Sequence, residues 1–247
     1  MKHSLRNLCV ATALILTSAA SAYAQTAPTT PWSVDVGIGW ENSLTGNAIS
    51  SGVGRLANRA VVIEEQTWDD VYGTAVLFRI GVGYELGDRT EARANFRYHS
   101  KDTEALQIGN LGGSPLFAEL DSYKAWALEG GYRSYFAEGS ETWRPYAEGT
   151  VGFARISEIQ ASLAAPALAI VLSDADFFDS STAFTFAVAG GVLYNFTDRF
   201  AADVRLGFRY IGGLNEADGL QAGGLENIDD DTSRWTLPLT VGARVRF

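Results

Sequence analysis

The sequence is poor in cysteine, histidine and basic residues. It contains one cysteine, Cys9, and two histidines among 247 residues. Cys9 lies within a predicted leader, so the rest of the chain offers no thiol for a disulfide or for nucleophilic chemistry. Lys and Arg total 19 against 29 Asp and Glu, which gives a formal net charge of −10. This balance argues against nucleic acid as a partner, because nucleic-acid-binding surfaces are basic.

Long hydrophobic runs are scarce beyond the amino terminus. Lys2 and Arg6 supply positive charge, residues 8–16 form an apolar core, and residues 22–24 read Ala-Tyr-Ala, an A-x-A cleavage site. This pattern is typical of a secretory signal peptide, and the apolar run is too short to span a bilayer comfortably. We therefore expect a signal peptide at 1–24, a short periplasmic segment at 25–31 and a folded domain at 32–247.

The rest of the chain contains segments in which apolar and polar residues alternate. Residues 234–247 read RWTLPLTVGARVRF, with every second residue apolar. A β-strand turns successive side chains to opposite faces, so this segment has one apolar and one polar face. Pro238 interrupts it. Proline is normally confined to edge strands, and strands that close into a barrel, as argued below, leave no edge. We therefore expect a bulge or kink at Pro238. The eight predicted strands are 32–42, 73–86, 90–100, 122–136, 144–156, 182–196, 200–211 and 234–247.

The predicted connections alternate between short and long. The short ones are 87–89, 137–143 and 197–199, whereas 43–72, 101–121, 157–181 and 212–233 are long. The long connections all fall at one end of the strands, which is the layout of outer-membrane barrels with short periplasmic turns. The sequence thus predicts an all-β fold: an eight-stranded antiparallel up-and-down transmembrane β-barrel with four long extracellular loops.

A soluble eight-stranded barrel would also show alternation, so the residue types on the two faces must distinguish a soluble barrel from a membrane barrel. The polar faces of 73–86 and 182–196 contain many Gly and Ala, which weaken a water-facing strand but leave room for charged groups inside a narrow barrel. The opposite face is bulky and aromatic, which suits lipid. The expected periplasmic girdle is Trp32, Tyr84, Tyr194, Phe196 and Phe247, and the expected outer girdle is Trp40, Tyr98, Trp126, Tyr210 and Trp235.

The inward positions carry many charges, which must pair because an unpaired buried charge is costly. Strand register predicts the pairs Arg133–Glu148 and Asp35–Arg244. It also places Glu129 near Arg79 and Arg97. The expected inward charges are Asp35, Glu41, Glu85, Glu91, Glu129, Glu148 and Asp203, with Arg79, Arg93, Arg97, Arg133, Arg144, Arg205, Arg209, Arg244 and Arg246.

Two interpretations of this lumenal ion network remain open. It is either a structural plug or a gate whose arginines exchange partners and open a narrow ion path. The plug is favoured, because aqueous porins need about 16–18 strands.

The chain offers little for catalysis. Lipid hydrolysis at the outer leaflet would need a His, a Ser and an acid within hydrogen-bonding reach. His99 and Ser100 are adjacent in the sequence, but neighbouring strand residues face opposite sides. We therefore expect no enzymatic activity, no cofactor and no resident metal, and keep lipid modification as a remote alternative.

The predicted loops are acidic, and 157–181 and 212–233 contain no Lys or Arg. Such charge is usually just solvated. The run Asp229, Asp230 and Asp231 is a candidate cation-binding loop, since clustered carboxylates suit hard cations. A bound Ca²⁺ or Mg²⁺ would bridge it to lipopolysaccharide phosphates or to neighbouring loops. Residues 161–172 are strongly apolar. We expect them to pack over the barrel mouth, with 61–63 as a partner; exposure as a binding patch and extension of the strands beyond the membrane are the alternatives.

The Trp143-Arg144-Pro145-Tyr146 entry to a strand, the glycines at 149 and 152, and the closing strand ending at Phe247 resemble small outer-membrane barrels of the OmpA transmembrane-domain and opacity-protein type. The resemblance implies residence in the outer membrane. It also implies that Phe247 is a terminal signal for the outer-membrane assembly machinery.

We expect a non-enzymatic protein with a structural or surface-interaction role through its acidic loops. Outer-membrane lipids, lipopolysaccharide and an extracellular ligand that the sequence does not name are the expected partners. The alternative function is a narrow, passive, porin-like channel gated by the lumenal network.

Overall fold

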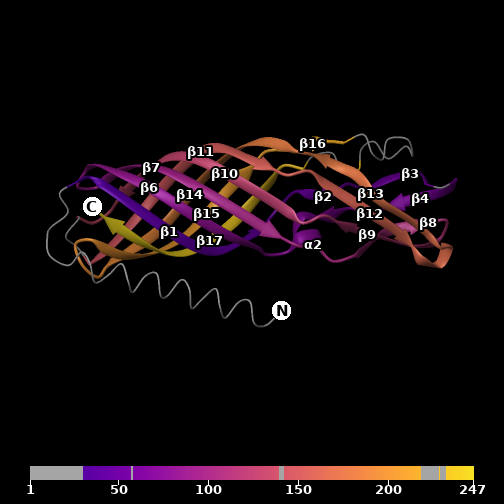
Figure 1. Cartoon of the computed structure of the whole chain (residues 1–247), viewed down its shortest axis with the longest axis horizontal. Coiled ribbons are helices and arrows are strands. Elements are labelled where there is room, and N and C mark those ends of the chain that lie inside the picture. The colour runs from indigo at the N-terminus through magenta and orange to yellow at the C-terminus, as the bar shows by residue number, and fades with distance from the viewer. Residues whose placement is uncertain (1–29, 57, 139–141, 218–227, 229–231) are drawn as a thin grey trace.

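The computed structural model describes residues 30–56, 58–138, 142–217, 228 and 232–247. The predicted signal peptide and most of the predicted periplasmic segment lie outside these residues. Eight long antiparallel strands close into a barrel in the order β1-β17-β15-β14-β11-β10-β7-β6 (Figure 1), which confirms the predicted fold class. Their bounds are β1 Trp32–Ser43, β6 Ala75–Gly87, β7 Thr90–Lys101, β10 Tyr123–Tyr135, β11 Trp143–Ile156, β14 Ser181–Asn195, β15 Phe200–Ile211 and β17 Arg234–Arg246.

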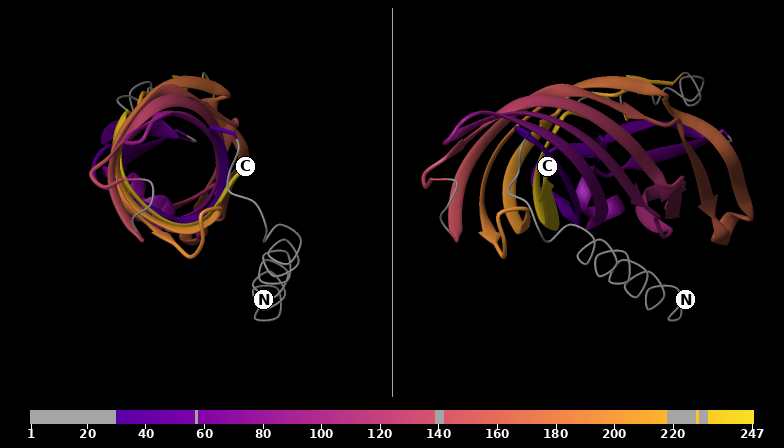
Figure 2. Two further views of the ribbon diagram at one scale, coloured as in Figure 1. Left: turned by 90° about the vertical axis from the view of Figure 1, so that its left-hand side faces the viewer. Right: turned by 60° about the vertical axis from the view of Figure 1, so that its left-hand side comes forward.

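The barrel closes where the first and last strands meet. β1 and β17 pair over eleven positions without a register shift, from Ser33↔Arg246 to Ser43↔Thr236. Near the chain end, the Phe247 amide donates to the Trp32 carbonyl at 3.1 Å. Seen along the axis, the strands form a ring (Figure 2, left). The three short connections lie at the same end as this junction, which we call the turn end.

Beyond the other end, the long loops fold into a second β-structure (Figure 1). It continues the long axis of the barrel, and we call it the extension. Its seven-stranded sheet has the order β16-β13-β12-β9-β8-β4-β3. The strand bounds are β3 Gly52–Leu56, β4 Arg59–Ile63, β8 Leu106–Leu111, β9 Ser114–Leu120, β12 Ile159–Ala165, β13 Ile170–Asp179 and β16 Asn215–Glu216.

Smaller elements complete the extension. β2 (Asn47–Ile49) pairs with β5 (Gln66–Thr67), which leads into the short helix α2 (Trp68–Tyr72). A 3₁₀ turn, η1 (Pro166–Leu168), connects β12 and β13. No helix in the described part of the chain is long and apolar enough to cross a membrane.

The extension is packed around an apolar core, because its strands also alternate, and this core continues into the outer ends of the barrel strands. Ala161, Leu163 and Ala165 on β12 are buried in one cluster with Val61 and Ile63 on β4. Burial of the two apolar segments in one core is therefore confirmed, but they lie in the sheet of the extension and not as a cover over the barrel mouth. The same segments also extend the β-structure outward, which was the alternative of strand extension.

Pro238 does not produce the expected bulge. The β1–β17 register runs unshifted through the pair Glu41↔Pro238. The β15–β17 ladder skips Pro238 and Leu237 and resumes in the same register. An antiparallel residue turns both its N–H and its C=O toward one neighbour, so the missing N–H interrupts pairing on one side only. Gly207 leaves room for the ring, since a Cβ there would lie 3.2 Å from Pro238 Cγ.

Candidate functional site

The barrel strands place charges inward and apolar groups outward, because successive side chains alternate. On β7, Arg97 is 1% exposed whereas Phe96 is 39% exposed. The predicted inward charges that are buried are Asp35, Glu41, Arg79, Glu91, Arg93, Arg97, Glu129, Arg133, Arg144, Glu148, Asp203, Arg205, Arg209 and Arg244. Glu85 and Arg246, at the turn end, are partly exposed.

At the turn end of the lumen, the ion pairs and hydrogen bonds are centred on Glu91. Arg244 binds it in a bidentate manner, with both nitrogen–oxygen distances at 2.9 Å. Arg93 Nη1 lies 3.2 Å from Glu91, and the Ser33 hydroxyl donates to it at 2.9 Å. The Tyr135 hydroxyl also donates to Glu91. This carboxylate is therefore neutralised and hydrogen-bonded, as burial of a charge requires.

The middle of the lumen is held by two further carboxylates. Glu148 pairs with Arg133 and with Arg205, at 2.7 Å in each case. Asp203 pairs with Arg79 at 3.0 Å. The predicted pair Arg133–Glu148 is confirmed, and its residues are direct partners in the β10–β11 ladder.

The outer part of the lumen contains Glu129 and Glu41. Glu129 lies 2.8 Å from Arg97 and 3.0 Å from Arg209. Arg209 also reaches Glu41 at 3.5 Å, and His99 Nδ1 lies 2.8 Å from the same carboxylate. A chain of ion pairs therefore continues to the barrel mouth.

The predicted pair Asp35–Arg244 is wrong. The two residues are opposite each other in the β1–β17 ladder, but Asp35 binds Arg79 and Arg93 instead. Arg79 was expected beside Glu129, and that expectation is wrong as well, whereas Arg97 is beside it as predicted. In a narrow barrel, long arginines cross the lumen, so ladder partners are not necessarily charge partners.

Two lumenal tyrosines were missed in the sequence. Tyr135 donates to Glu91, and Tyr146 donates to Asp203 at 2.6 Å. The Arg133 guanidinium also lies 3.8 Å from the centroid of the Tyr146 ring, a cation–π distance. Each tyrosine is separated by an even number of residues from the inward charges of its own strand, β10 or β11. This spacing places it on the lumenal face and could have identified it from the sequence.

The turn end of the lumen is covered by Arg144. Its Cζ atom lies 3.9 Å from the centroid of the Tyr135 ring, and Nη2 donates to the Asp88 carbonyl at 2.9 Å. Glu85 lies 4.0 Å from Arg144 and 3.8 Å from Arg246. The periphery of the network is thus charged but only partly shielded from solvent.

The opposite mouth is covered by aromatic side chains of α2, in the extension, and of the outer end of β10. Trp68 stacks on Tyr72, with ring centroids 5.5 Å apart, and Tyr123 packs edge-on against Trp68 at 5.8 Å. Arg234 is buried against both Trp68 and Tyr123. Burial raises the pKa of the Tyr72 phenol, whose hydroxyl donates to the Asp121 carbonyl at 3.0 Å. Only a small cavity of about 30 Å³ separates this aromatic cover from Glu41.

The geometry does not assemble a hydrolase site at His99. The imidazole is 4% exposed and lies among Glu41 and Arg209 inside the lumen. Ser100, the next residue, is half-buried on the other face of β7. The divergence expected from strand alternation is therefore present.

No group of three or more His, Cys, Asp or Glu side chains within the described ranges is arranged to hold a metal ion. The candidate cation-binding run Asp229, Asp230 and Asp231 lies outside those ranges.

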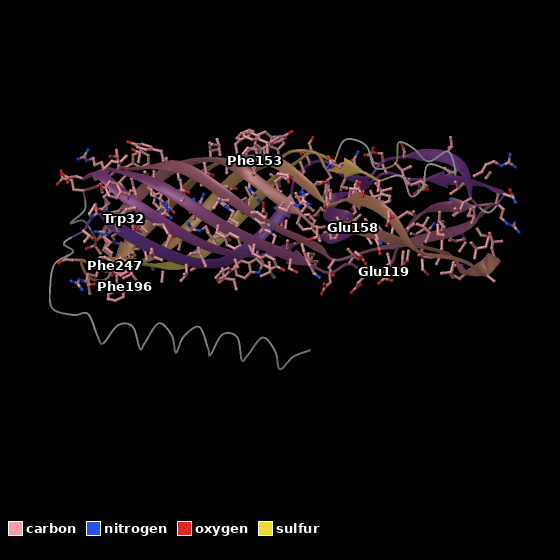
Figure 3. All side chains as sticks on the ribbon, turned by 45° about the horizontal axis from the view of Figure 1, so that its top comes forward. Trp32, Glu119, Phe153, Glu158, Phe196 and Phe247 are labelled. Atoms are coloured by element: carbon pink, nitrogen blue, oxygen red, sulfur yellow. The ribbon has the colours of Figure 1, made fainter. Side chains whose placement is uncertain are left out.

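The outer face of the barrel carries the predicted aromatic residues. Trp32 and Phe247 are about half exposed at the turn end, and Figure 3 shows Phe196 at the same end of the barrel. Trp40 and Trp126, toward the extension, are similarly exposed. Between the two levels the exposed residues are apolar, as a lipid-facing belt requires.

A charged interior, an apolar outer belt and a closed antiparallel ring are together typical of an outer-membrane β-barrel. The sequence model of the outer membrane protein beta-barrel domain family matches residues 10–247. The chain belongs to this family. Its location is accordingly the outer membrane, with the turn end periplasmic and the extension outside the cell.

Several solved barrels are similar to this family member. Neisserial surface protein A is 17% identical, with 88% of this chain and 98% of that chain covered and a TM-score of 0.48. Outer membrane protein OprG from Pseudomonas aeruginosa is 10% identical, with 90% and 98% covered and a TM-score of 0.45. The attachment invasion locus protein Ail from Yersinia pestis is 12% identical, with 86% and 97% covered and a TM-score of 0.40. None of the curated proteins matches the chain.

Proposed function

We propose that this barrel is a non-enzymatic, closed support that holds a folded extension outside the cell, where the extension has a surface-interaction role. The observation that carries the proposal is the filling of the lumen by arginine. Arg79, Arg97, Arg133, Arg144, Arg209 and Arg244 are each no more than 1% exposed. A lumen filled by paired charges is a rigid plug, because each side chain is held by its partners.

The extension supports the second half of the proposal. It is a β-sheet with an apolar core that continues into the outer ends of the barrel strands, rather than a set of independent loops. Its surface carries exposed acids such as Glu119, Glu158 and Asp176. A folded acidic surface beyond the membrane is suited to an extracellular ligand with positive charge.

The positions of the outer face and of the chain end suggest two further kinds of partner, membrane lipids and the assembly machinery. The outer face of the barrel would contact outer-membrane lipids and lipopolysaccharide. Phe247, half exposed at the periplasmic end of the closing strand, would be accessible to the assembly machinery.

A narrow channel is the second candidate function. The observation in its favour is that Arg205 Nη1 and Arg209 Nη2 have no hydrogen-bond partner among the described atoms. Ordered water would satisfy such groups, and water in the lumen is a first requirement for ion passage.

Single-channel recording in a planar bilayer separates the two functions. We expect no steady openings from the wild-type protein. Steady openings that are altered in Arg97→Ala and absent from a protein-free bilayer would replace the plug with the channel. Enzymatic action on lipid has its own test: the lipid A mass spectrum of cells overexpressing the protein should match that of cells carrying an empty vector.

A further inference from the structure

Two basic side chains lie on the outer face of the barrel, at the level where the lipid belt ends. Lys124 on β10 and Arg155 on β11 are both exposed, whereas Ala125 and Ala154 beside them are buried. Strand alternation therefore turns both bases away from the lumen. Trp126, a member of the outer girdle, is the ladder partner of Arg155. The bases thus lie just at the outer boundary of the apolar belt.

The two bases are close enough to share one ligand. Lys124 is two residues further out along β10 than Trp126, which makes it the diagonal neighbour of Arg155. Diagonal neighbours on paired strands are roughly 7–8 Å apart, within joint reach of two long side chains. The β10–β11 pairing continues to this level, because the Ser157 amide donates to the Lys124 carbonyl at 3.0 Å.

Neither base forms an ion pair with a carboxylate of the described chain, unlike Arg89 at the turn end, which pairs with Glu138. Arg155 donates instead to two hydroxyls, Thr182 Oγ1 at 3.0 Å and Ser180 Oγ at 2.7 Å. A guanidinium has five N–H donors, so further donors remain for an anion. These hydroxyls hold the guanidinium in place without neutralising it.

An apolar surface lies directly beneath the bases. Phe153 is 61% exposed, and its ring centroid is 6.2 Å from that of Phe184 on β14. Figure 3 shows Phe153 over the barrel and Glu158 further toward the extension. Position 155 lies between them along the chain. The order from membrane to exterior is therefore apolar rings, two bases with hydroxyls, and then acids.

We propose that Lys124 and Arg155, with the hydroxyls of Ser180 and Thr182, bind a phosphate group of a phosphorylated lipid in the outer leaflet. Trp126, Phe153 and Phe184 contact its acyl chains. Ammonium and guanidinium groups are the usual phosphate ligands of proteins. The acidic extension above the site repels soluble anions, whereas a membrane lipid reaches the bases laterally beneath those acids. This argument selects a lipid phosphate over free phosphate.

Lipid exchange tests the site directly. The protein is placed in phosphatidylcholine nanodiscs that contain either lipid A with two phosphates or the same lipid A after removal of both phosphates, and retained lipid A is counted by native mass spectrometry. We expect the wild type to prefer the phosphorylated form by about ten-fold or more, as charge-assisted hydrogen bonds provide. In Lys124→Ala/Arg155→Ala the preference should fall to about two-fold or less.

The matched control is Arg55→Ala/Arg59→Ala, which also removes two exposed positive charges outside the cell, but from the tip of the extension. It should keep the wild-type preference. Retained heat-dependent gel mobility shows that each variant is folded. If both double variants lost the preference for phosphorylated lipid A equally, net charge alone would explain it and the proposal would be overturned. A wild type with no such preference would also overturn the proposal.

Discussion

The guanidinium of Arg234 stacks on the indole of Trp68, with 3.8 Å between its Cζ atom and the ring centroid. The contact joins the first residue of β17 to the first residue of α2, and therefore the barrel to the extension. Arg234 is 4% exposed, and the Tyr123 ring lies 4.7 Å away on the same cation. A desolvated cation–π contact is worth about 2 kcal/mol or more. Aromatic faces thus take the place of a carboxylate at the mouth of the lumen.

Trp68→Ala should loosen the extension and leave the barrel intact. The change removes a buried ring from the core of the extension and uncovers Arg234, at a cost of about 3–5 kcal/mol. Trypsin should cleave faster at Arg55 and Arg59, while heat-dependent gel mobility stays unchanged. Trp40→Ala, which removes a lipid-facing ring, is the control and should leave cleavage at the wild-type rate. If both variants resist trypsin equally, Trp68 does not hold the extension.

Glu148→Gln should destabilise the barrel strongly. The carboxylate is 3% exposed and neutralises Arg133 and Arg205, so its loss leaves buried cations uncompensated. Removing one partner of a buried pair costs about 3–5 kcal/mol. Urea unfolding of the protein in phosphatidylcholine vesicles, followed by tryptophan fluorescence, measures the change.

Glu138→Gln is the matched control for this change. Its pair with Arg89 is 3.4 Å long and both side chains are more than half exposed, so its free energy of unfolding should change by less than about 1 kcal/mol. Equal effects of the two substitutions would show that the lumenal network does not stabilise the barrel.

Gly83→Ala should be costly, whereas Gly130→Ala should be tolerated. A Cβ at position 83 would lie 1.5 Å from Glu91 Oε1 and 2.6 Å from Ser33 Oγ. Glu91 cannot swing away without losing its bidentate bonds to Arg244. Overpacking of this kind costs about 1–3 kcal/mol. At position 130, on the lipid face of β10, a Cβ meets nothing within 4 Å. The same urea titration compares them, and a stable Gly83→Ala would contradict the packing of Glu91.

The amino-terminal cap of α2 should respond to acid. The Thr67 side chain and backbone both donate to Asp70, and these hydrogen bonds hold the pKa of the Asp70 carboxyl below its ordinary value of 3.8. A depressed folded-state pKa gives stability that is complete above the unfolded-state value and is lost as the pH falls through the folded-state value. Carboxyl-carbon NMR should show Asp70 titrating below 3.8, and Thr67→Ala should raise that pKa. An unchanged value in Thr67→Ala would exclude the capping box as its cause.

The barrel strands were readable from the sequence because each one satisfies a local rule. Strand alternation gave the facing of both the lumenal charges and the lipid belt. The pair Arg133–Glu148 was also accessible, since the short turn between β10 and β11 sets the register of that hairpin. The strand containing Pro238 was placed correctly although the bulge was wrong, because the loss of one N–H affects one ladder and the other continues.

The ion-pair partners of Asp35 and Arg79 could not be predicted from the register of adjacent strands. Arg79 on β6 reaches Asp203 on β15, across a lumen whose width depends on closure of the whole ring. Side-chain length relative to that width decides which charges meet. No pairwise register contains that information.

The sequence by itself determined the barrel, its orientation and the sign of charge on each face, because these follow from a period of two and from the lengths of neighbouring connections. Only the tertiary structure decided that the loops join into one sheet. Contacts such as β9 with β12 and β4 with β8 link different loops across long stretches of chain, so their formation depends on the barrel first bringing the loop ends together. The β10–β11 hairpin brings Lys124 and Arg155 to diagonal positions, and the closed barrel places this pair on its outer face at the membrane boundary, where the two bases can share one ligand.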